Sequence, residues 1–285
     1  MTQFTQHTRQ PVETLSAQPL ADAGPNTGDR IRQVTVAVCM VAAVAGSLVG
    51  SGALGGTPIA EAAGGALGAD ATLIAPAVPA FSIWSVIYLG LVAYTVWQFL
   101  PAQAASGRQR RLGYPIAASL VLNAAWILSI QAGWLAFSVV VIVALLAVLA
   151  WIFVLYRRTP GSGVVEAVVV DGVMGLYLGW VCVATAANIT SWLTAIGFSG
   201  WGIPATAWAI AVVAVAGLVG IGLAVAGRGR LAPAVSLCWG LTWLAHARLS
   251  GELLSTPTAI TAIIAVAAVL AATILWRLRA QQVTA

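Results

Sequence analysis

The stretch LAFSVVVIVALLAVLAWIFVLY, residues 135–156, contains no charged side chain. A transmembrane helix needs about 20 predominantly apolar residues, so this stretch is long enough to cross a bilayer. Strands of a membrane β-barrel alternate polar and apolar residues, whereas this run is continuously apolar. Helices also satisfy their own backbone hydrogen bonds inside lipid. The stretch therefore predicts a transmembrane α-helix.

The rest of the 285-residue chain has the same character, because 60% of its residues are hydrophobic and only 7% are charged. A soluble domain carries about 25% charged residues, so a soluble fold is excluded. We predict an all-α, polytopic transmembrane bundle of about eight helices. Windows of about 19 residues place them at residues 33–54, 79–100, 112–130, 135–156, 167–190, 205–226, 231–249 and 257–276.

The positive charges follow this helix count. All 13 cations are Arg, and with eight helices every one except Arg248 falls in segments on one side of the membrane. Cytoplasmic loops of membrane proteins are enriched in Lys and Arg, which predicts that both chain ends are cytoplasmic. The Arg-, Ala- and Gly-rich composition suggests a bacterial chain, and hence the bacterial plasma membrane. The cations are scattered in twos and threes, so we expect no nucleic-acid partner.

No catalytic or metal-binding pattern stands out. Residues 1–30 are polar and predict a disordered cytoplasmic tail. The three cysteines, Cys39, Cys182 and Cys238, lie far apart inside apolar runs and predict packing residues. We therefore expect no enzyme, no metal site and no cofactor.

Three segments carry aromatic and amide side chains inside predicted helices. They are IAPAVPAFSIWSVIY at residues 74–88, LNAAW at 122–126 and LYLGWVCVATAAN at 176–188. In this order they resemble the TspO/MBR family, the tryptophan-rich sensory proteins related to the translocator protein. The resemblance covers residues 31–193 and implies a five-helix core, to which residues 194–285 add three further transmembrane helices, as in longer bacterial members.

The resemblance implies a receptor or sensor for a hydrophobic planar ligand, such as a porphyrin (a tetrapyrrole) or a sterol. The ligand-binding residues that it implies are Trp84, Tyr88, Asn123, Trp126, Tyr177, Trp180, Ala184 and Asn188. The chain departs from the family pattern in two places. The Trp-Tyr…Lys-Pro stretch of the first loop is missing, and Leu176 replaces the Pro expected before the helix-five Tyr.

The helix directions bring these residues to the same depth. At 1.5 Å per residue, Trp84, Trp126 and Asn188 all lie in the outer half of the membrane. An amide in hydrocarbon is costly without a partner, so Asn123 and Asn188 should face the bundle interior. Two interpretations remain open: interhelical hydrogen bonds that hold the bundle together, or a ligand cavity with aromatic walls.

Other polar groups have more ordinary interpretations. Asp171 lies about one turn into its helix from the cytoplasmic side and is expected to reach the interface or to pair with Arg, with proton coupling as the alternative. Arg248 and Glu252 have i, i+4 spacing and are expected to pair. The loop of residues 55–78 is either a flexible connector or a lid over an external pocket. Gly46 and Gly50 favour close helix packing or a homodimer face.

Two other functions compete with the receptor. A secondary transporter would explain why Tyr-Leu-Gly recurs at residues 88–90 and 177–179 in helices of opposite direction. An accessory membrane protein would use the last three helices as a docking surface. In every case the expected partners are membrane lipid and, for the receptor, a hydrophobic small molecule.

Overall fold

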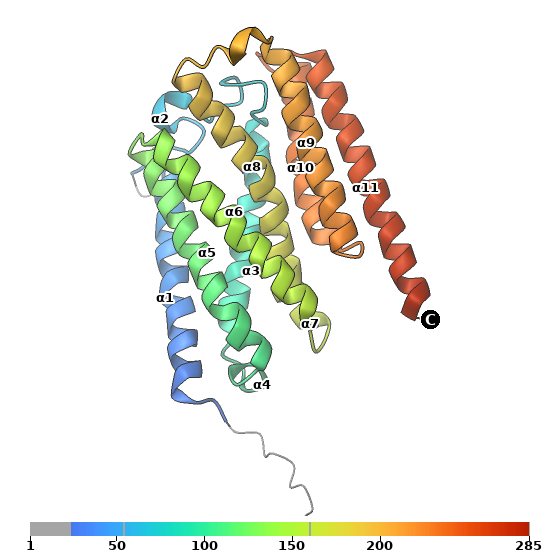
Figure 1. Ribbon diagram of the computed structural model, residues 1–285. Coiled ribbons are helices and arrows are strands. Elements are labelled where there is room, and N and C mark those ends of the chain that lie inside the picture. The colour runs from blue at the N-terminus through green and yellow to red at the C-terminus, as the bar shows by residue number, and fades with distance from the viewer. Residues whose placement is uncertain (1–23, 54, 160, 285) are drawn as a thin grey trace, which may run out of the picture.

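The structure is a computed structural model that describes residues 24–53, 55–159 and 161–284. In these residues it contains helices and no strand, and Figure 1 shows the long helices side by side in one bundle. Eight long helical segments follow each other along the chain: α1 (Thr27–Gly50), η1 with α3 (Val78–Ser82, Ile83–Trp97), α5 (Gly107–Gln131), α6 (Leu135–Arg158), α7 with η2 and α8 (Val164–Glu166, Ala167–Gly172, Val173–Ala195), α9 (Ala205–Ala226), α10 (Leu231–Ser250) and α11 (Thr256–Thr284). Three short turns, α2 (Ala62–Gly65), α4 (Pro101–Ala104) and η3 (Gly200–Gly202), lie in the loops.

The eight apolar runs of the sequence each coincide with one long helical segment, so the all-α polytopic bundle is confirmed. Seven of the segments are long and apolar enough to cross a membrane by length and composition. The exception is α10, which carries His246 and Arg248 yet packs between α8 and α11. With eight antiparallel segments, α1 begins and α11 ends at the same end of the bundle (Figure 1).

Helix α1 begins before the predicted tail boundary at residue 30. Asn26 caps it, because its Oδ1 accepts from the Asp29 backbone N–H at 2.9 Å. In return the Asn26 N–H donates to Asp29 Oδ2 at 3.1 Å, which completes a capping box. Residues 27–30 are therefore helical, and residues 1–23 of the predicted tail lie outside the described part of the chain.

Small residues set the spacing between helices. Gly46 of α1 lies against Ala124 of α5, and Gly50 lies against Ile127. These two glycines thus pack α1 onto α5 within the chain, as close helix packing predicts. Gly179 of α8 lies directly under the Pro233 backbone of α10, where a Cβ atom would stand 2.1 Å from the Pro233 carbonyl oxygen.

The core is divided between two groups of helices. One buried cluster joins α1, α3, α5, α6 and α8, and a second joins α8 to α9, α10 and α11. Helix α8 belongs to both clusters, since it contacts α6 on one side and α10 on the other. The last three helices therefore pack onto the first five through α8.

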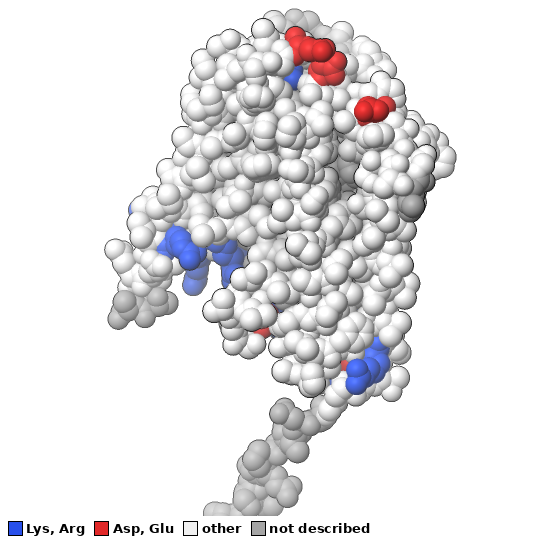
Figure 2. Space-filling view, turned by 180° about the vertical axis from the view of Figure 1, so that it is seen from behind, with Lys and Arg blue, Asp and Glu red and all other residues white. Residues whose placement is uncertain are grey.

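The two ends of the bundle differ in charge. Figure 2 shows Arg side chains gathered at the lower end and acidic side chains at the upper end. At the Arg-rich end, Arg108 pairs with Asp171 and with Glu166, the latter at 2.9 Å, and all three side chains are buried. Arg230 holds the second oxygen of Asp171 at 2.8 Å. The expected pairing of Asp171 with Arg is confirmed, and the carboxylate lies on the π-helix η2.

The expected pair of Arg248 with Glu252 is wrong in this structure. Arg248 is 1% exposed, and its Nη2 donates instead to the carbonyl oxygen of Ala69. Glu252 follows the end of α10 and is exposed to solvent. The i, i+4 spacing works only within a continuous helix, and α10 ends at Ser250.

Candidate functional site

An aromatic cluster fills the centre of the bundle toward the acidic end, with the Trp84 indole in its middle. The Trp126 indole stacks on it with ring centroids 6.3 Å apart. Tyr177 and Trp180 meet Trp84 edge-on at 5.7 and 6.2 Å. Tyr88, one turn further along α3, lies 5.9 Å from Trp84. The structure therefore brings five of the eight predicted site residues into one cluster.

The amide of Asn188 serves as a link between helices. The Trp126 indole N–H donates to Asn188 Oδ1 at 2.9 Å, and Asn188 Nδ2 donates to Ser138 Oγ at 2.9 Å. Asn188 is wholly buried, so these bonds satisfy both ends of its amide. They connect α5, α6 and α8, which supports the packing interpretation for this residue.

Asn123 makes a second, incomplete link. Its Nδ2 donates to the Tyr88 hydroxyl at 2.7 Å, and that hydroxyl donates to the Ala43 carbonyl oxygen at 3.2 Å. This chain joins α5, α3 and α1. Asn123 is 1% exposed, and its Oδ1 has no hydrogen-bond partner among the described residues. A buried acceptor without a partner is costly, which distinguishes Asn123 from Asn188.

A cavity of about 490 Å³ lies beside the cluster. Pockets for small organic ligands measure roughly 300–1,000 Å³, so this one is in range. Three predicted site residues line it: Trp84, Tyr88 and Trp126. The other lining residues come from α1, the loop after it, η1, α3 and α5: Ser47, Gly50, Ser51, Pro58, Ile59, Ala60, Val78, Phe81, Ser85 and Ile127.

A much smaller space of about 20 Å³ lies on the far side of the two stacked indoles. Trp84, Trp126 and Phe81 line both spaces and so form the partition between them. Trp180 and Ala184 line only the small one. The Trp180 indole N–H has no acceptor among the described residues, although the side chain is 1% exposed.

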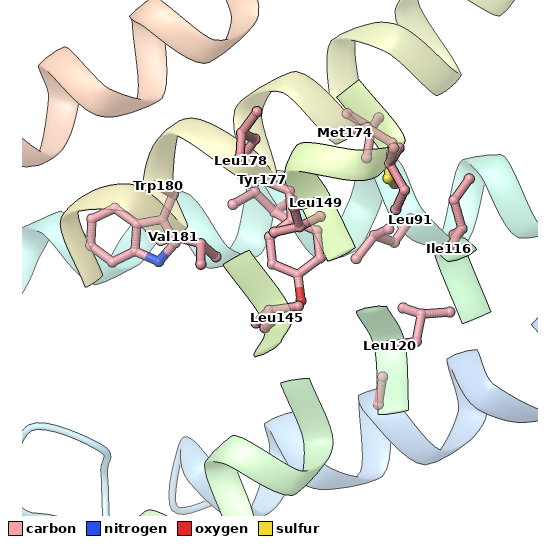
Figure 3. Close-up of a cluster of buried hydrophobic side chains, with 14 of the residues drawn as sticks. Leu91, Ile116, Leu120, Leu145, Leu149, Met174, Tyr177, Leu178, Trp180 and Val181 are labelled. Carbon is pink, nitrogen blue, oxygen red and sulfur yellow. The ribbon is translucent and has the colours of Figure 1, made fainter. Parts of the chain in front are cut away.

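The remaining predicted residues line neither space. Figure 3 shows Tyr177 surrounded by leucines, including Leu145 and Leu149. Its hydroxyl donates to the Ser119 carbonyl oxygen at 3.4 Å. Tyr177, like Asn123 and Asn188, therefore supports the lining residues from behind rather than facing the larger cavity.

The sequence did not single out the wall that α1 and the following loop contribute. Ser47 lies on α1, Ser51 follows four residues later at its C-cap, and Ser85 follows Trp84; these serines inside or next to apolar runs were the available signal. The loop wall at Pro58, Ile59 and Ala60 depends on how the loop folds back over α1. The Ile59 N–H donates to the Gly50 carbonyl oxygen at 2.9 Å and fixes that fold.

These features define a class: a multi-pass α-helical membrane protein with an aromatic-walled cavity near one end of the bundle. The sequence model of a family described as TSPO-like protein matches residues 33–276. The chain therefore belongs to the TSPO-like protein family. The match extends past the expected residues 31–193 and includes α9, α10 and most of α11. No curated protein and no solved structure matches the chain.

Proposed function

We propose that the protein is a TSPO-like membrane receptor that binds a planar hydrophobic ligand of the porphyrin or sterol class. The single observation that carries the proposal is the cavity of about 490 Å³ with Trp84 and Trp126 in its wall. Family membership supports it, because the resemblance implies ligands of this kind. The proposal is a binding function and assigns no catalytic step and no cofactor.

The lining suits such a ligand. Aromatic pairs contribute roughly 0.5–1.5 kcal/mol beyond simple burial, and the stacked indoles of Trp84 and Trp126 offer a face to a planar ring. Hydroxyl groups of Ser47, Ser51 and Ser85 line the same space and supply polar contacts that can orient the ligand. The wall is thus mostly apolar with a few polar groups.

The first long loop belongs to the proposed site. Pro58, Ile59 and Ala60 line the cavity from the loop side. The Thr57 backbone and the Gln131 side chain exchange two hydrogen bonds, of 3.1 and 2.6 Å, that hold this part of the loop to the end of α5. The arrangement favours the lid interpretation of the loop over a free connector.

The test is binding of protoporphyrin IX to the purified full-length protein, followed by porphyrin absorbance so that loss of a Trp does not alter the signal. Ser47→Phe places a ring in the cavity and should weaken binding about tenfold or more, because the ring occupies ligand volume. Val41→Phe is the matched control, since Val41 is 71% exposed on the outer side of the same helix.

Trp84→Phe tests the aromatic wall, with Trp151→Phe on the exposed face of α6 as its control. We expect saturable micromolar binding that Trp84→Phe weakens severalfold and Trp151→Phe leaves unchanged. Absence of saturable binding, or binding indifferent to both cavity variants, would overturn the proposal. The transporter and accessory interpretations would then lead.

We also propose that the Arg-rich end faces the cytoplasm of a bacterial cell, which the asymmetry of the Arg residues supports. Fusion of the C-terminus to a fluorescent protein should give fluorescent cells, and fusion to alkaline phosphatase should give inactive enzyme. The reverse pattern would contradict this orientation.

A further inference from the structure

The first long loop is held at two places by different parts of the chain. Its beginning, around Thr57, is bonded to α1 and α5 and covers the cavity. Its second part, residues 66–77, leads into η1 and lies against α10. Helix α10 is one of the three helices that the five-helix core does not include.

Three hydrogen bonds tie this second part and η1 to α10. Arg248 donates from Nη2 to the Ala69 carbonyl oxygen. The Ala77 N–H donates to the Trp243 carbonyl oxygen at 3.2 Å. The Trp239 indole N–H donates to the Ala80 carbonyl oxygen at 2.9 Å. The three groups on α10 lie between residues 239 and 248, so the loop and η1 are held along about two and a half turns of the helix.

The apolar side chains of the loop also pack against both groups of helices. Ile74 is 3% exposed and belongs to the buried cluster of the last helices, with Leu244 and Ala245. Leu67 is also buried but belongs to the cluster of the first five helices. The loop therefore bridges the two clusters, and its Ile74 side chain is buried in the cluster of the last helices.

The segment that α10 holds is a wall of the cavity. Val78 and Phe81 of η1 line the cavity, and Ala77 and Ala80, which bond to α10, are their neighbours. Phe81 also meets the Trp180 ring edge-on at 5.8 Å. A shift of η1 away from α10 would therefore change the shape of the cavity and the partition beside it.

Arg248 itself indicates that the anchoring is important, because burial of its charge costs free energy. The side chain is 1% exposed, and its Nε and Nη1 have no hydrogen-bond partner among the described residues. Replacing a buried, poorly paired charge by an apolar side chain of similar size is often neutral or stabilising. The hydrogen bond from Arg248 to the loop is therefore the contact that explains a charged side chain at this buried position.

We propose that α10 anchors the second part of the loop and η1, with Trp239 and Arg248 as the positioning residues, and so sets the shape of the ligand cavity. The anchoring stands on the contacts alone, whereas its effect on ligand rests on the proposed function. The last three helices are then an internal scaffold for the binding site and not a separate module.

The test is hydrogen–deuterium exchange of the full-length protein in nanodiscs, with Trp239→Phe and Arg248→Met. Trp239→Phe removes the N–H and keeps a ring, and Arg248→Met removes the donor and keeps the length. Trp208→Phe is the matched control, because its indole N–H donates to the Gly200 carbonyl oxygen at 3.1 Å, away from the first loop. Residues 66–82 should exchange roughly three- to tenfold faster in both variants and unchanged in the control.

Two further readouts separate positioning from general stability. Arg248→Met should leave the thermal midpoint equal or higher while the loop exchanges faster, which a purely structural residue would not show. Protoporphyrin IX affinity should change severalfold in both variants. Unchanged exchange at residues 66–82 overturns the anchor, and faster exchange with unchanged affinity overturns its effect on the cavity. If the wild type binds no porphyrin, the proposed function fails and exchange still decides the anchor.

Discussion

The two ends of the bundle both bury polar groups, but they treat them differently. At the Arg-rich end every buried carboxylate and carboxamide among the described residues has a partner, as in the bonds of Gln109 to Tyr94 and Glu166. At the acidic end, Asn123 and Trp180 each leave one polar atom without a partner among the described residues. Asn123 bonds to Tyr88 of the cavity wall, and Trp180 lines the small space next to the cavity. Paired carboxylates and carboxamides indicate a structural role, although Arg32 Nε and the Tyr156 hydroxyl at the Arg-rich end have no hydrogen-bond partner among the described residues. At the acidic end, unsatisfied groups in contact with cavity-lining residues support a binding role.

The largest effect is expected from breaking the buried ion pairs at the Arg-rich end. Arg108→Met removes the cation shared by Glu166 and Asp171, and Glu166 then keeps only neutral partners, Ser162 and Gln109. Loss of one partner of a buried pair costs about 3–5 kcal/mol. We expect this loss in the free energy of unfolding in detergent, with porphyrin affinity of the folded fraction unchanged. Arg157→Met, at an exposed site on α6, is the control. A loss of affinity without a loss of stability would reverse the roles of the two ends.

The contact between the two groups of helices, where α8 packs on α10, gives the next largest effect. Gly179→Ala would place a Cβ atom 2.1 Å from the Pro233 carbonyl oxygen, so α10 must move away from α8. Overpacking of this kind costs about 1–3 kcal/mol. Because α10 also holds the first loop, exchange at residues 66–82 should rise together with the loss of stability. Gly46→Ala is the control, since its Cβ would meet Ala124 at an ordinary 3.5 Å. Equal effects of the two substitutions would contradict the close α8–α10 contact.

Within the acidic end, Asn188 and Asn123 are expected to have different roles. Asn188→Ala leaves the Trp126 N–H and the Ser138 hydroxyl without Asn188, and should lower the free energy of unfolding by about 1–2 kcal/mol. Asn123→Ala removes one bond, to the Tyr88 hydroxyl, and should cost about 1 kcal/mol or less. Porphyrin affinity should respond in the opposite order, because Tyr88 lines the cavity and Asn188 does not. Chemical unfolding and porphyrin titration of both variants check the reversal.

The sequence predicted the helices well because their signal is local. Each apolar run, such as residues 135–156, must form a helix in lipid wherever the others lie, and α6 indeed spans Leu135–Arg158. The cluster around Trp84 was also predictable, since helix direction and rise fix the depth of a residue. The pairing of Asp171 with Arg was predictable because an unpaired charge in a membrane is costly.

What the sequence missed depends on the fold of a loop and on contacts between distant helices. No pattern in residues 51–77 shows that Pro58 covers a cavity or that Ala69 meets Arg248. The spacing of Arg248 and Glu252 suggested a local pair, and the end of α10 between them removed it. Side-chain packing also decides which of the eight predicted residues face the cavity. Trp84 lines it, whereas Tyr177 does not.

The smallest effect concerns an ion pair at the Arg-rich end whose cation is open to solvent. Arg110 holds Asp29 through two hydrogen bonds of 2.7 Å; the Asp29 side chain is 2% exposed, but the Arg110 side chain is 46% exposed. Asp29 keeps the bond from the Asn26 N–H when Arg110 is replaced. Exposed pairs contribute about 0–1 kcal/mol and are weakened by salt. Arg110→Gln should therefore lower the free energy of unfolding by at most about 1 kcal/mol, and the difference should shrink at high ionic strength. The Arg108 variant should keep its larger loss in the same buffer, because its pairs are buried and poorly screened. Equal salt sensitivity of the two variants would contradict the assignment of their different stabilities to the burial of the Arg side chain.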